Sequence, residues 1–155
     1  MSVQLTYTKN TRNALVGLVS DLGPYRIESY TNETGIVPFG LGVQHGTAEG
    51  DAVLGSGTAG LGFLGVATRH TAKENSVAGA EEEQYAEKQT MAIIREGSVW
   101  VELAAGGVRS NLIYMIEATG VFNVGTPGAG EFHVGTLETD TAAGELGLLR
   151  LNTPS

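Results

Sequence analysis

The stretch Met91-Ala-Ile-Ile-Arg-Glu-Gly-Ser-Val-Trp-Val-Glu-Leu103 decides the expected fold of this chain. Residues 92–94 and 98–103 are two runs rich in β-branched and aromatic side chains, which favour strands. The three residues between them end in Gly97, and a three-residue loop that ends in glycine is a common hairpin connection because glycine reaches positive φ without steric cost. The pattern therefore predicts a β-hairpin.

Side chains alternate along the second run of this predicted hairpin. Val99, Val101 and Leu103 fall on one face of the strand, and Trp100 falls on the opposite face. Trp100 is the only tryptophan in the chain. A ring of this size is covered either by another part of its own domain or by another protein. The sequence leaves both alternatives open.

The composition is that of a single domain built from short strands. A chain of 155 residues has the size of one domain and can bury a hydrophobic core without disulfides or structural metal ions. Its 23 glycines, four prolines and few charged residues favour an all-β protein with many tight turns. The chain has no cysteine, which excludes disulfides, thiolate metal sites and cysteine nucleophiles.

Charge and hydropathy exclude two classes of partner. The formal net charge is −8, although the two charged residues among the first twenty are the basic Lys9 and Arg12. An acidic body repels phosphate backbones, so nucleic-acid binding is not expected. No apolar run approaches the roughly 20 residues that cross a membrane, and the first residues lack the pattern of a secretory signal. We therefore expect a soluble protein that is used without export and without membrane contact.

Further short strands, separated by turn signals, continue along the chain. They are predicted at residues 25–30, 36–44, 51–54, 61–67, 112–116, 132–137 and 146–151. This number of strands indicates an all-β domain, a compact β-barrel or sandwich with a jelly-roll-like arrangement. We expect an extended N-terminal arm at residues 1–20, the β-domain at 21–152 and a short tail at 153–155. The polar residues 68–85 are predicted to form one long loop.

The sequence contains no recognisable catalytic or cofactor chemistry. His45, His70 and His133 lie in different segments and form none of the spacings typical of metal ligands. Residues 55–60 match the glycine pattern of dinucleotide-binding loops, but residues 61–67 after them are predicted to be a strand. That loop requires a helix there to hold the pyrophosphate. We expect no catalytic residue, no metal and no cofactor.

Several segments together resemble a known family. The best-marked block is Arg95-Glu-Gly-Ser-Val-Trp-Val-Glu102, and Phe63-Leu-Gly-Val-Ala67 is a second block. The remaining matching segments are 21–24, 27–29, Glu33, 36–40, 69–71, 74–75, 84–85 and 143–152. In this order and spacing they resemble the structural cement proteins of tailed bacteriophages.

This resemblance implies a structural role on a virion. Such proteins add to the outer surface of an assembled icosahedral head and bridge neighbouring major capsid subunits. They stabilise the shell against the pressure of packaged DNA, and they act as dimers or trimers at local symmetry axes. The resemblance thus implies synthesis in the host cytoplasm, a place on the outside of the capsid, and two partners, the major capsid protein and further copies of the chain.

Candidate contact residues follow from this role. An extended arm can add a strand to an exposed sheet edge through main-chain hydrogen bonds, and its cations can meet acidic groups on the shell. Large aromatic side chains are typical anchors of interfaces, although for each of them a place in the core is an equal alternative. The candidates for contact with the capsid or a sister subunit are Val3, Leu5, Tyr7, Lys9, Arg12, Arg69, His70, Tyr85 and Trp100.

A second class of function uses the same aromatic residues. Trp100, Tyr114 and Tyr85 are side chains of the kind that stack on sugar rings. They favour, as the alternative, a small-ligand or carbohydrate-binding β-domain such as an adhesion module. That alternative predicts ligand binding by a monomer without a capsid partner.

Overall fold

The computed structural model describes residues 15–20, 23–55, 62–69, 84–126 and 128–151. These residues form eleven strands and no helix, and accordingly no described helix is long and apolar enough to cross a membrane. The strands are β1 (Arg26–Asn32), β2 (Val37–Pro38), β3 (Gly42–His45), β4 (Asp51–Val53), β5 (Phe63–Ala67), β6 (Gln84–Tyr85), β7 (Thr90–Glu102), β8 (Leu112–Ile116), β9 (Phe122–Val124), β10 (Glu131–Leu137) and β11 (Leu146–Leu151).

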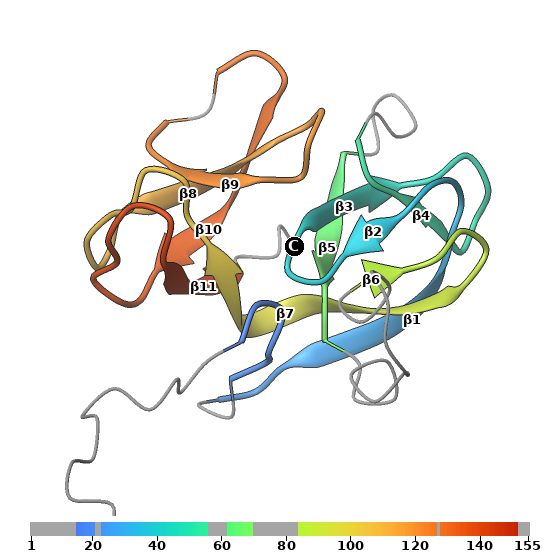
Figure 1. Ribbon diagram of the computed structural model, residues 1–155, viewed down its shortest axis with the longest axis horizontal. Helices are drawn as coiled ribbons and strands as arrows, with labels where there is room; N and C mark the ends of the chain where they lie inside the picture. Colours follow the sequence, from blue (N-terminus) through green and yellow to red (C-terminus); the bar gives the residue numbers. More distant parts are fainter. Residues whose placement is uncertain (1–14, 21–22, 56–61, 70–83, 127, 152–155) are drawn as a thin grey trace, which may run out of the picture.

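Nine of these strands form one sheet that closes on itself. The strand order is β1-β4-β3-β5-β7-β11-β10-β8-β9, and β1 also pairs with β7. The first five strands therefore make a closed ring, seen on the right of Figure 1. The pairing of β1 with β4 is parallel, and the other pairings of this ring are antiparallel.

The remaining strands of this sheet make a second ring with β7, seen on the left of Figure 1, whereas β2 and β6 pair with each other in a separate two-stranded sheet. β7 pairs with β11, β11 with β10, β10 with β8, and β8 with β9, all in antiparallel fashion. A parallel bridge between Leu103 and Phe122 joins β9 back to the end of β7. β7 is thus shared by both rings, and the molecule is a pair of small barrels fused along this strand.

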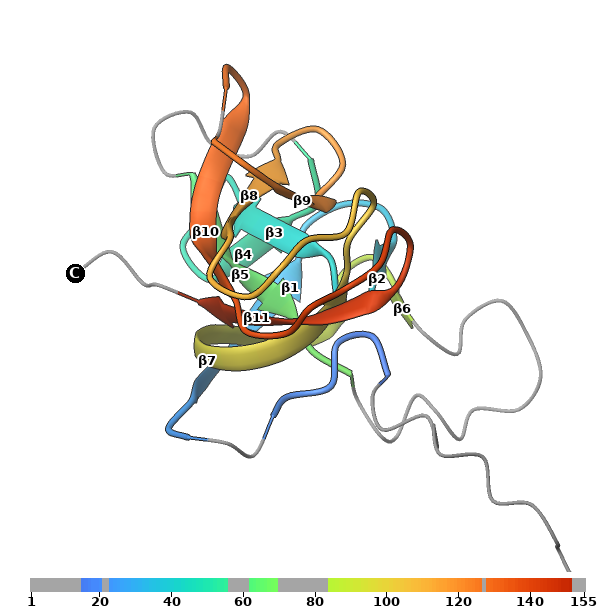
Figure 2. The same cartoon turned by 90° about the vertical axis from the view of Figure 1, so that its left-hand side faces the viewer.

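The predicted hairpin at residues 92–103 is wrong. Residues 90–102 form the single continuous strand β7, in which residues 90–96 pair with β1 and residues 97–102 pair with β11. Gly97 has φ +114°, and a register shift opposite Arg26 and Ile27 adds a bulge just before it. A bulge bends a strand without ending it. Figure 2 shows the resulting strong curvature of β7.

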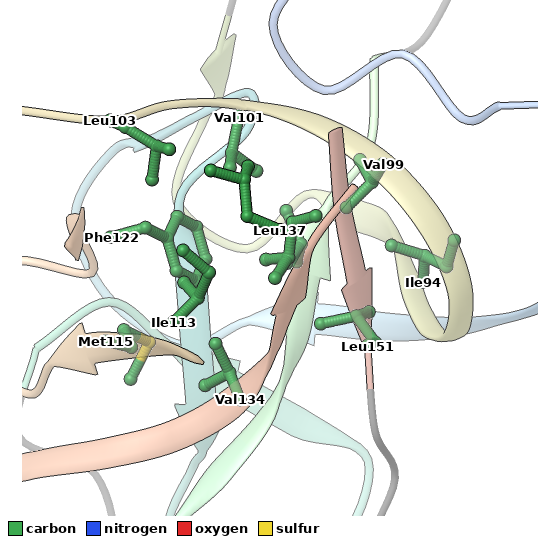
Figure 3. Close-up of a cluster of buried hydrophobic side chains, with 12 residues drawn as sticks. Ile94, Val99, Val101, Leu103, Ile113, Met115, Phe122, Val134, Leu137 and Leu151 are labelled. Atoms are coloured by element: carbon green, nitrogen blue, oxygen red, sulfur yellow. The ribbon is translucent and has the colours of Figure 1, made fainter. Parts of the chain in front are cut away.

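Two hydrophobic clusters lie on opposite faces of the β5–β7 pair. Ile93 and its cross-strand partner Ala67 belong to the cluster of the first ring, whereas Ile94 and its partner Val66 belong to that of the second. Figure 3 shows how β7 curves around the second cluster. The second cluster contains Val66, Ile94, Val99, Val101, Leu103, Ile113, Met115, Phe122, Val134, Leu137, Leu149 and Leu151. The first contains Val37, Phe39, Val43, Ala52, Leu64, Ala67, Tyr85, Met91 and Ile93.

The predicted all-β class with a barrel core is confirmed. Nine of the eleven strands join in one closed sheet rather than in the two facing sheets of a sandwich or jelly roll. The strands predicted at 112–116 and 146–151 have the predicted bounds, and residues 63–67 form a strand as expected. Residues 36–44 are divided instead between β2 and β3, with Gly40 at φ +80° between them. β9 was not predicted, because it is only three residues long in a glycine-rich segment. β6 was not predicted either: residues 84–85, at the end of the predicted loop 68–85, form a strand because they pair with β2.

Candidate interaction surface

The described N-terminal residues 15–20 form a short additional edge along β7. Val19 makes an isolated antiparallel bridge with Val99. Beside this bridge, the Trp100 amide donates a hydrogen bond to the Leu18 carbonyl at 3.0 Å. This bridge and bond fix the point at which the N-terminal segment joins the barrels.

Arg69 ties the same segment to the first ring. Its Nε donates a hydrogen bond to the Val16 carbonyl at 3.1 Å, and its backbone amide donates to the Gly17 carbonyl at 2.8 Å. The guanidinium carbon lies 5.5 Å from the centre of the Phe39 ring, within the range of a cation–π interaction. Arg69 therefore holds residues 15–20 against the core from its position after β5.

Three apolar side chains form a row on the outer face of the second ring. Leu18 lies opposite Trp100, and Trp100 lies opposite Leu148 on β11. Since neighbouring Val99 points into the second cluster, the alternation along β7 turns Trp100 away from that core. Leu148 is 5% exposed, Trp100 is half-buried and Leu18 is 39% exposed. Solvent exposure along the row thus increases from Leu148 on β11 to Leu18 in the N-terminal segment.

A second, more polar row lies beside the apolar one. It crosses β7, β11, β10 and β8 through Ser98, Arg150, Thr136 and Leu112, which are cross-strand partners in that order. The Ser20 amide extends this row by donating to the Ser98 carbonyl at 2.9 Å. The two rows together make a continuous surface, here called the outer face of the second ring.

Glu138 joins the two rows. Its Oε2 accepts a hydrogen bond from Ser98 Oγ at 3.0 Å, and its Oε1 lies 3.7 Å from Arg150 Nη1. Its backbone amide donates to the Leu148 carbonyl at 2.8 Å. Glu138 also lines a hollow of about 350 Å³, whose opposite wall includes Tyr25. The outer face is therefore hollowed where the polar row meets the beginning of β1.

A second group of charged side chains lies on the first ring. Arg95 Nη1 lies 3.1 Å from Glu28 Oε2 and 3.4 Å from the Tyr30 hydroxyl, which itself donates to Glu28 at 3.1 Å. The hydrogen bond from Arg95 lowers the pKa of Glu28 despite the opposing effect of burial. Burial, together with the Glu28 hydrogen bond, raises the pKa of Tyr30. Burial, and then the charge of Arg95, lowers the pKa of His45 nearby. These shifts favour the ionised carboxylate of Glu28 and the neutral imidazole of His45.

Neither group of described side chains has the composition of a metal site. Among the described residues, no three His, Asp or Glu side chains are close enough together to hold a metal ion. The outer face of the second ring instead combines exposed apolar side chains, an ion pair and hydroxyls on a rigid sheet. Such a combination is typical of a surface that binds another protein.

Comparison with known proteins identifies the family. The model of the structural cement protein family (E217 gp24/Pam3 gp6) matches residues 3–152, nearly the whole chain. The chain belongs to this family. It is therefore a capsid-associated structural protein of a phage, in a family of structural proteins rather than enzymes. The resemblance found from the sequence blocks is confirmed.

Solved structures establish the fold of this cement protein independently. A chain from the capsid of Myoviridae phage XM1 superposes with a TM-score of 0.70 and 19% sequence identity. The superposition covers 98% of both chains. A comparison with curated proteins finds no match. At this low identity the likeness shows that the cement protein and the phage XM1 chain share their fold.

Tyr85 of the cement protein lies in the core. It is 1% exposed, its hydroxyl donates to the Thr68 carbonyl at 2.7 Å, and its ring packs edge-on against Phe39 at 5.1 Å between centroids. Of the two alternatives that the sequence left open for Tyr85, the structure selects the core. The ring is not available to a capsid subunit, and it is not available to a sugar either.

Two of the other predicted contact residues of the cement protein lie in the described part of the chain. Trp100 lies on the outer face and is half-buried, and Arg69 lies against the N-terminal segment. Both residues form hydrogen bonds with the segment 15–20. The remaining candidates lie outside the described residues and stay predictions: Val3, Leu5, Tyr7, Lys9, Arg12 and His70.

Sequence reasoning missed most of the outer face. Leu18 carried a signal, since it directly precedes the predicted domain in an apolar run. Arg150 and Glu138 carried none, because they meet only through the pairing of β10 with β11 and the bond from Ser98. Their positions depend on long-range register, which a sequence of short strands does not specify.

Proposed function

We propose that this cement protein binds the outer surface of an icosahedral phage head and bridges neighbouring major capsid subunits. In this role it stabilises the shell against the internal pressure of packaged DNA. Because a bridging protein touches several subunits, modest contacts combine into tight attachment. The proposal extends the capsid-stabilising role of the family to a named partner and a named surface.

The observation that carries this proposal is the outer face of the second ring. Leu18 is exposed next to the half-buried Trp100, on a face whose opposite side is filled by the second cluster. An aromatic residue flanked by an exposed leucine and bordered by polar groups has the anatomy of a small protein interface. The rigid sheet beneath holds these side chains in place before any partner arrives, which lowers the entropy cost of binding.

The N-terminal arm, residues 1–20, supplies a second contact in this proposal. Residues 2–13 add a strand to a sheet edge of a capsid subunit, with Lys9 and Arg12 meeting acidic groups there. The hydrogen bonds of residues 15–20 to β7 support this role, because they attach the C-terminal end of the arm to the outer face. Copies of the chain assemble as dimers or trimers at local symmetry axes of the shell.

Co-sedimentation with matching phage heads that lack the protein tests the proposal. Saturable binding at a fixed ratio to the major capsid protein is the expected result, and the ratio narrows which axes are occupied. Deletion of residues 2–13 should weaken binding while the barrels stay folded by circular dichroism. Folded wild-type protein that does not sediment with expanded heads would overturn the proposal.

A further inference from the structure

A second hollow opens beside the polar row, on the side away from the N-terminal segment. Its volume is about 410 Å³, and it shares Glu138 and Arg150 with the hollow already described. Arg109 and Ser110, from the loop before β8, form its other wall, and Thr136 of β10 lies between. The side chains of Arg150 and Thr136 are cross-strand partners, so the sheet itself holds this part of the hollow in place.

The two arginines of this hollow are unusually accessible. The side chains of Arg109 and Arg150 are 72% and 66% exposed, whereas those of Arg26 and Arg95 in the ion pairs of the first ring are 46% and 24% exposed. Arg109 Nε lies 3.5 Å from Asp140, and Arg150 Nη1 lies 3.7 Å from Glu138. Exposed pairs at such distances contribute little, and each guanidinium has five N–H donors. Both arginines can therefore turn donors toward a new acceptor.

The other polar lining groups are two hydroxyls and one carboxylate. Ser110 and Thr136 supply hydroxyls, and Glu138 is the single carboxylate among the described residues that line the hollow. That carboxylate already accepts the hydrogen bond of Ser98. The lining carries two positive charges and one negative charge, and Asp140, which pairs with Arg109 beside the hollow, adds a second negative charge. The hollow is thus balanced in charge on a chain whose net charge is −8, and its two guanidinium groups can donate hydrogen bonds to an anion.

The backbone at Ser110 is held in a conformation that serine rarely adopts. Its φ is +73°, in the left-handed region that costs a non-glycine residue free energy. The Ser110 amide donates to the Leu137 carbonyl at 2.8 Å, which pins the loop against β10. The loop thus holds Ser110 at the wall of the hollow between Arg109 and the end of β10. Because strained residues cluster at functional sites, Ser110 marks this hollow as a candidate binding site.

We propose that this hollow binds a carboxylate side chain, an aspartate or glutamate, presented by the major capsid protein. Arginine binds carboxylates through two parallel hydrogen bonds, and the nearby hydroxyls supply further donors. Val108 precedes Arg109, Leu112 begins β8, and both side chains are exposed. They can pack against the methylene groups of an aspartate or glutamate side chain. A nucleic-acid phosphate is disfavoured because a long polyanion meets the repulsion of the whole acidic chain. The inference rests on the proposed function, which it refines by naming the chemistry of one contact.

The first test measures head binding by co-sedimentation at low and moderate salt. The double variant R109Q/R150Q should bind at least tenfold more weakly than wild type, and its binding should depend less on salt. The variant R26Q, which removes a cation of the first ring, is the matched control and should bind as wild type does. The variant R109K/R150K should recover part of the loss, since lysine keeps the charge without the planar fork. Equal binding of R109Q/R150Q and wild type would overturn the proposal.

The second test does not require heads and so separates this inference from the proposed function. Titration with N-acetylglutamate amide, followed by amide NMR, should shift the Ser110 and Thr136 signals saturably in wild type and not in R109Q/R150Q. N-acetyllysine amide should leave these signals in place. No shift with the glutamate probe, or much tighter binding of inorganic phosphate, would overturn the assignment of a carboxylate. Loss of self-association by R109Q/R150Q in sedimentation velocity, with head binding intact, would overturn the assignment of the capsid subunit as the partner.

Discussion

A Cβ atom placed on Gly97 would lie 2.7 Å from the Cβ atom of Tyr25. It would also lie 3.0 Å from the Tyr25 Cα atom and 3.1 Å from the Pro24 carbonyl oxygen. The chain entering β1 thus packs directly on the bulge of β7, because residue 97 has no side chain there. With φ +114°, the backbone of Gly97 is also in a region that only glycine adopts readily.

Substitution of Gly97 by alanine should therefore destabilise the fold for two reasons. The strained φ alone costs about 1–3 kcal/mol, and displacement of the backbone at residues 24–25 adds to this. Gly23 is the matched control, because its φ is +135° and nothing lies within 4 Å of a Cβ built on it. In urea unfolding, G97A should lose at least about 1 kcal/mol more free energy of unfolding than G23A. Equal losses would mean that the contact with Tyr25 relaxes without cost.

The second prediction concerns the anchor of the N-terminal segment. R69M keeps most of the aliphatic stem but removes the Nε hydrogen bond to Val16 and the charge above Phe39. The expected cost is about 1–2 kcal/mol in the free energy of unfolding. Hydrogen exchange should quicken at the Trp100 amide, which donates to Leu18, more than at the Ile93 amide in the centre of the first ring.

R26M is the control for this prediction, since Arg26 is half exposed and forms only surface ion pairs. It should change the free energy of unfolding by less than about 1 kcal/mol. Unchanged exchange at Trp100 in R69M would show that the backbone bonds of residues 15–20 hold the segment without the guanidinium.

The part of β7 that was predictable from sequence is its local pattern. The alternation of Val99, Val101 and Leu103 correctly predicted a buried face, because side-chain period depends only on neighbouring residues. The connection at Gly97 was misread, since glycine at positive φ serves equally in a hairpin loop and in a bulge of a continuous strand. The decision between them is made by β1 and β11, which pair with β7 from more than 40 residues away on either side.

In the candidate site, too, only features that depend on neighbouring residues were predictable from the sequence. Trp100 was named as a candidate because it is the only tryptophan and lies opposite the face of Val99, Val101 and Leu103. Tyr85 was equally prominent, but its burial depends on Phe39 and on the Thr68 carbonyl, which are distant in the chain. The hollow at Arg109 and Arg150 was not found, because residues 41 positions apart meet there through the pairing of β8 with β10 and of β10 with β11.

The third prediction concerns pH. Burial and the charge of Arg95 lower the pKa of His45, and the Arg95 hydrogen bond lowers the pKa of Glu28. For both groups the unfolded chain binds more protons than the folded chain between the two pKa values, so stability rises with pH there. Stability should therefore fall first as the pH drops below about 6.5, from His45, and again below about 4.3, from Glu28.

Urea midpoints measured between pH 7.5 and 3.5 check this prediction. H45Q should flatten the upper part of the profile, and E28Q should flatten the lower part. Tyr30, which shares the hydrogen bonds of Glu28 and has a raised pKa, should add a loss of stability only above about pH 10. A profile of H45Q that is parallel to wild type between pH 7.5 and 5.5 would contradict the assignment of the upper part to His45.

The last prediction separates attachment from stability on the outer face. L18S replaces a side chain that is 39% exposed, so the free energy of unfolding should change by no more than about 0.5 kcal/mol. If Leu18 is buried against a capsid subunit, it contributes up to about 1.5 kcal/mol to attachment, and L18S should bind heads about tenfold more weakly. The control is I36S, because Ile36 is 55% exposed beside β2, which pairs with β6 and is not part of the second ring. Comparable weakening by L18S and I36S would contradict a contact centred on Trp100, since any loss of surface apolar area would then suffice.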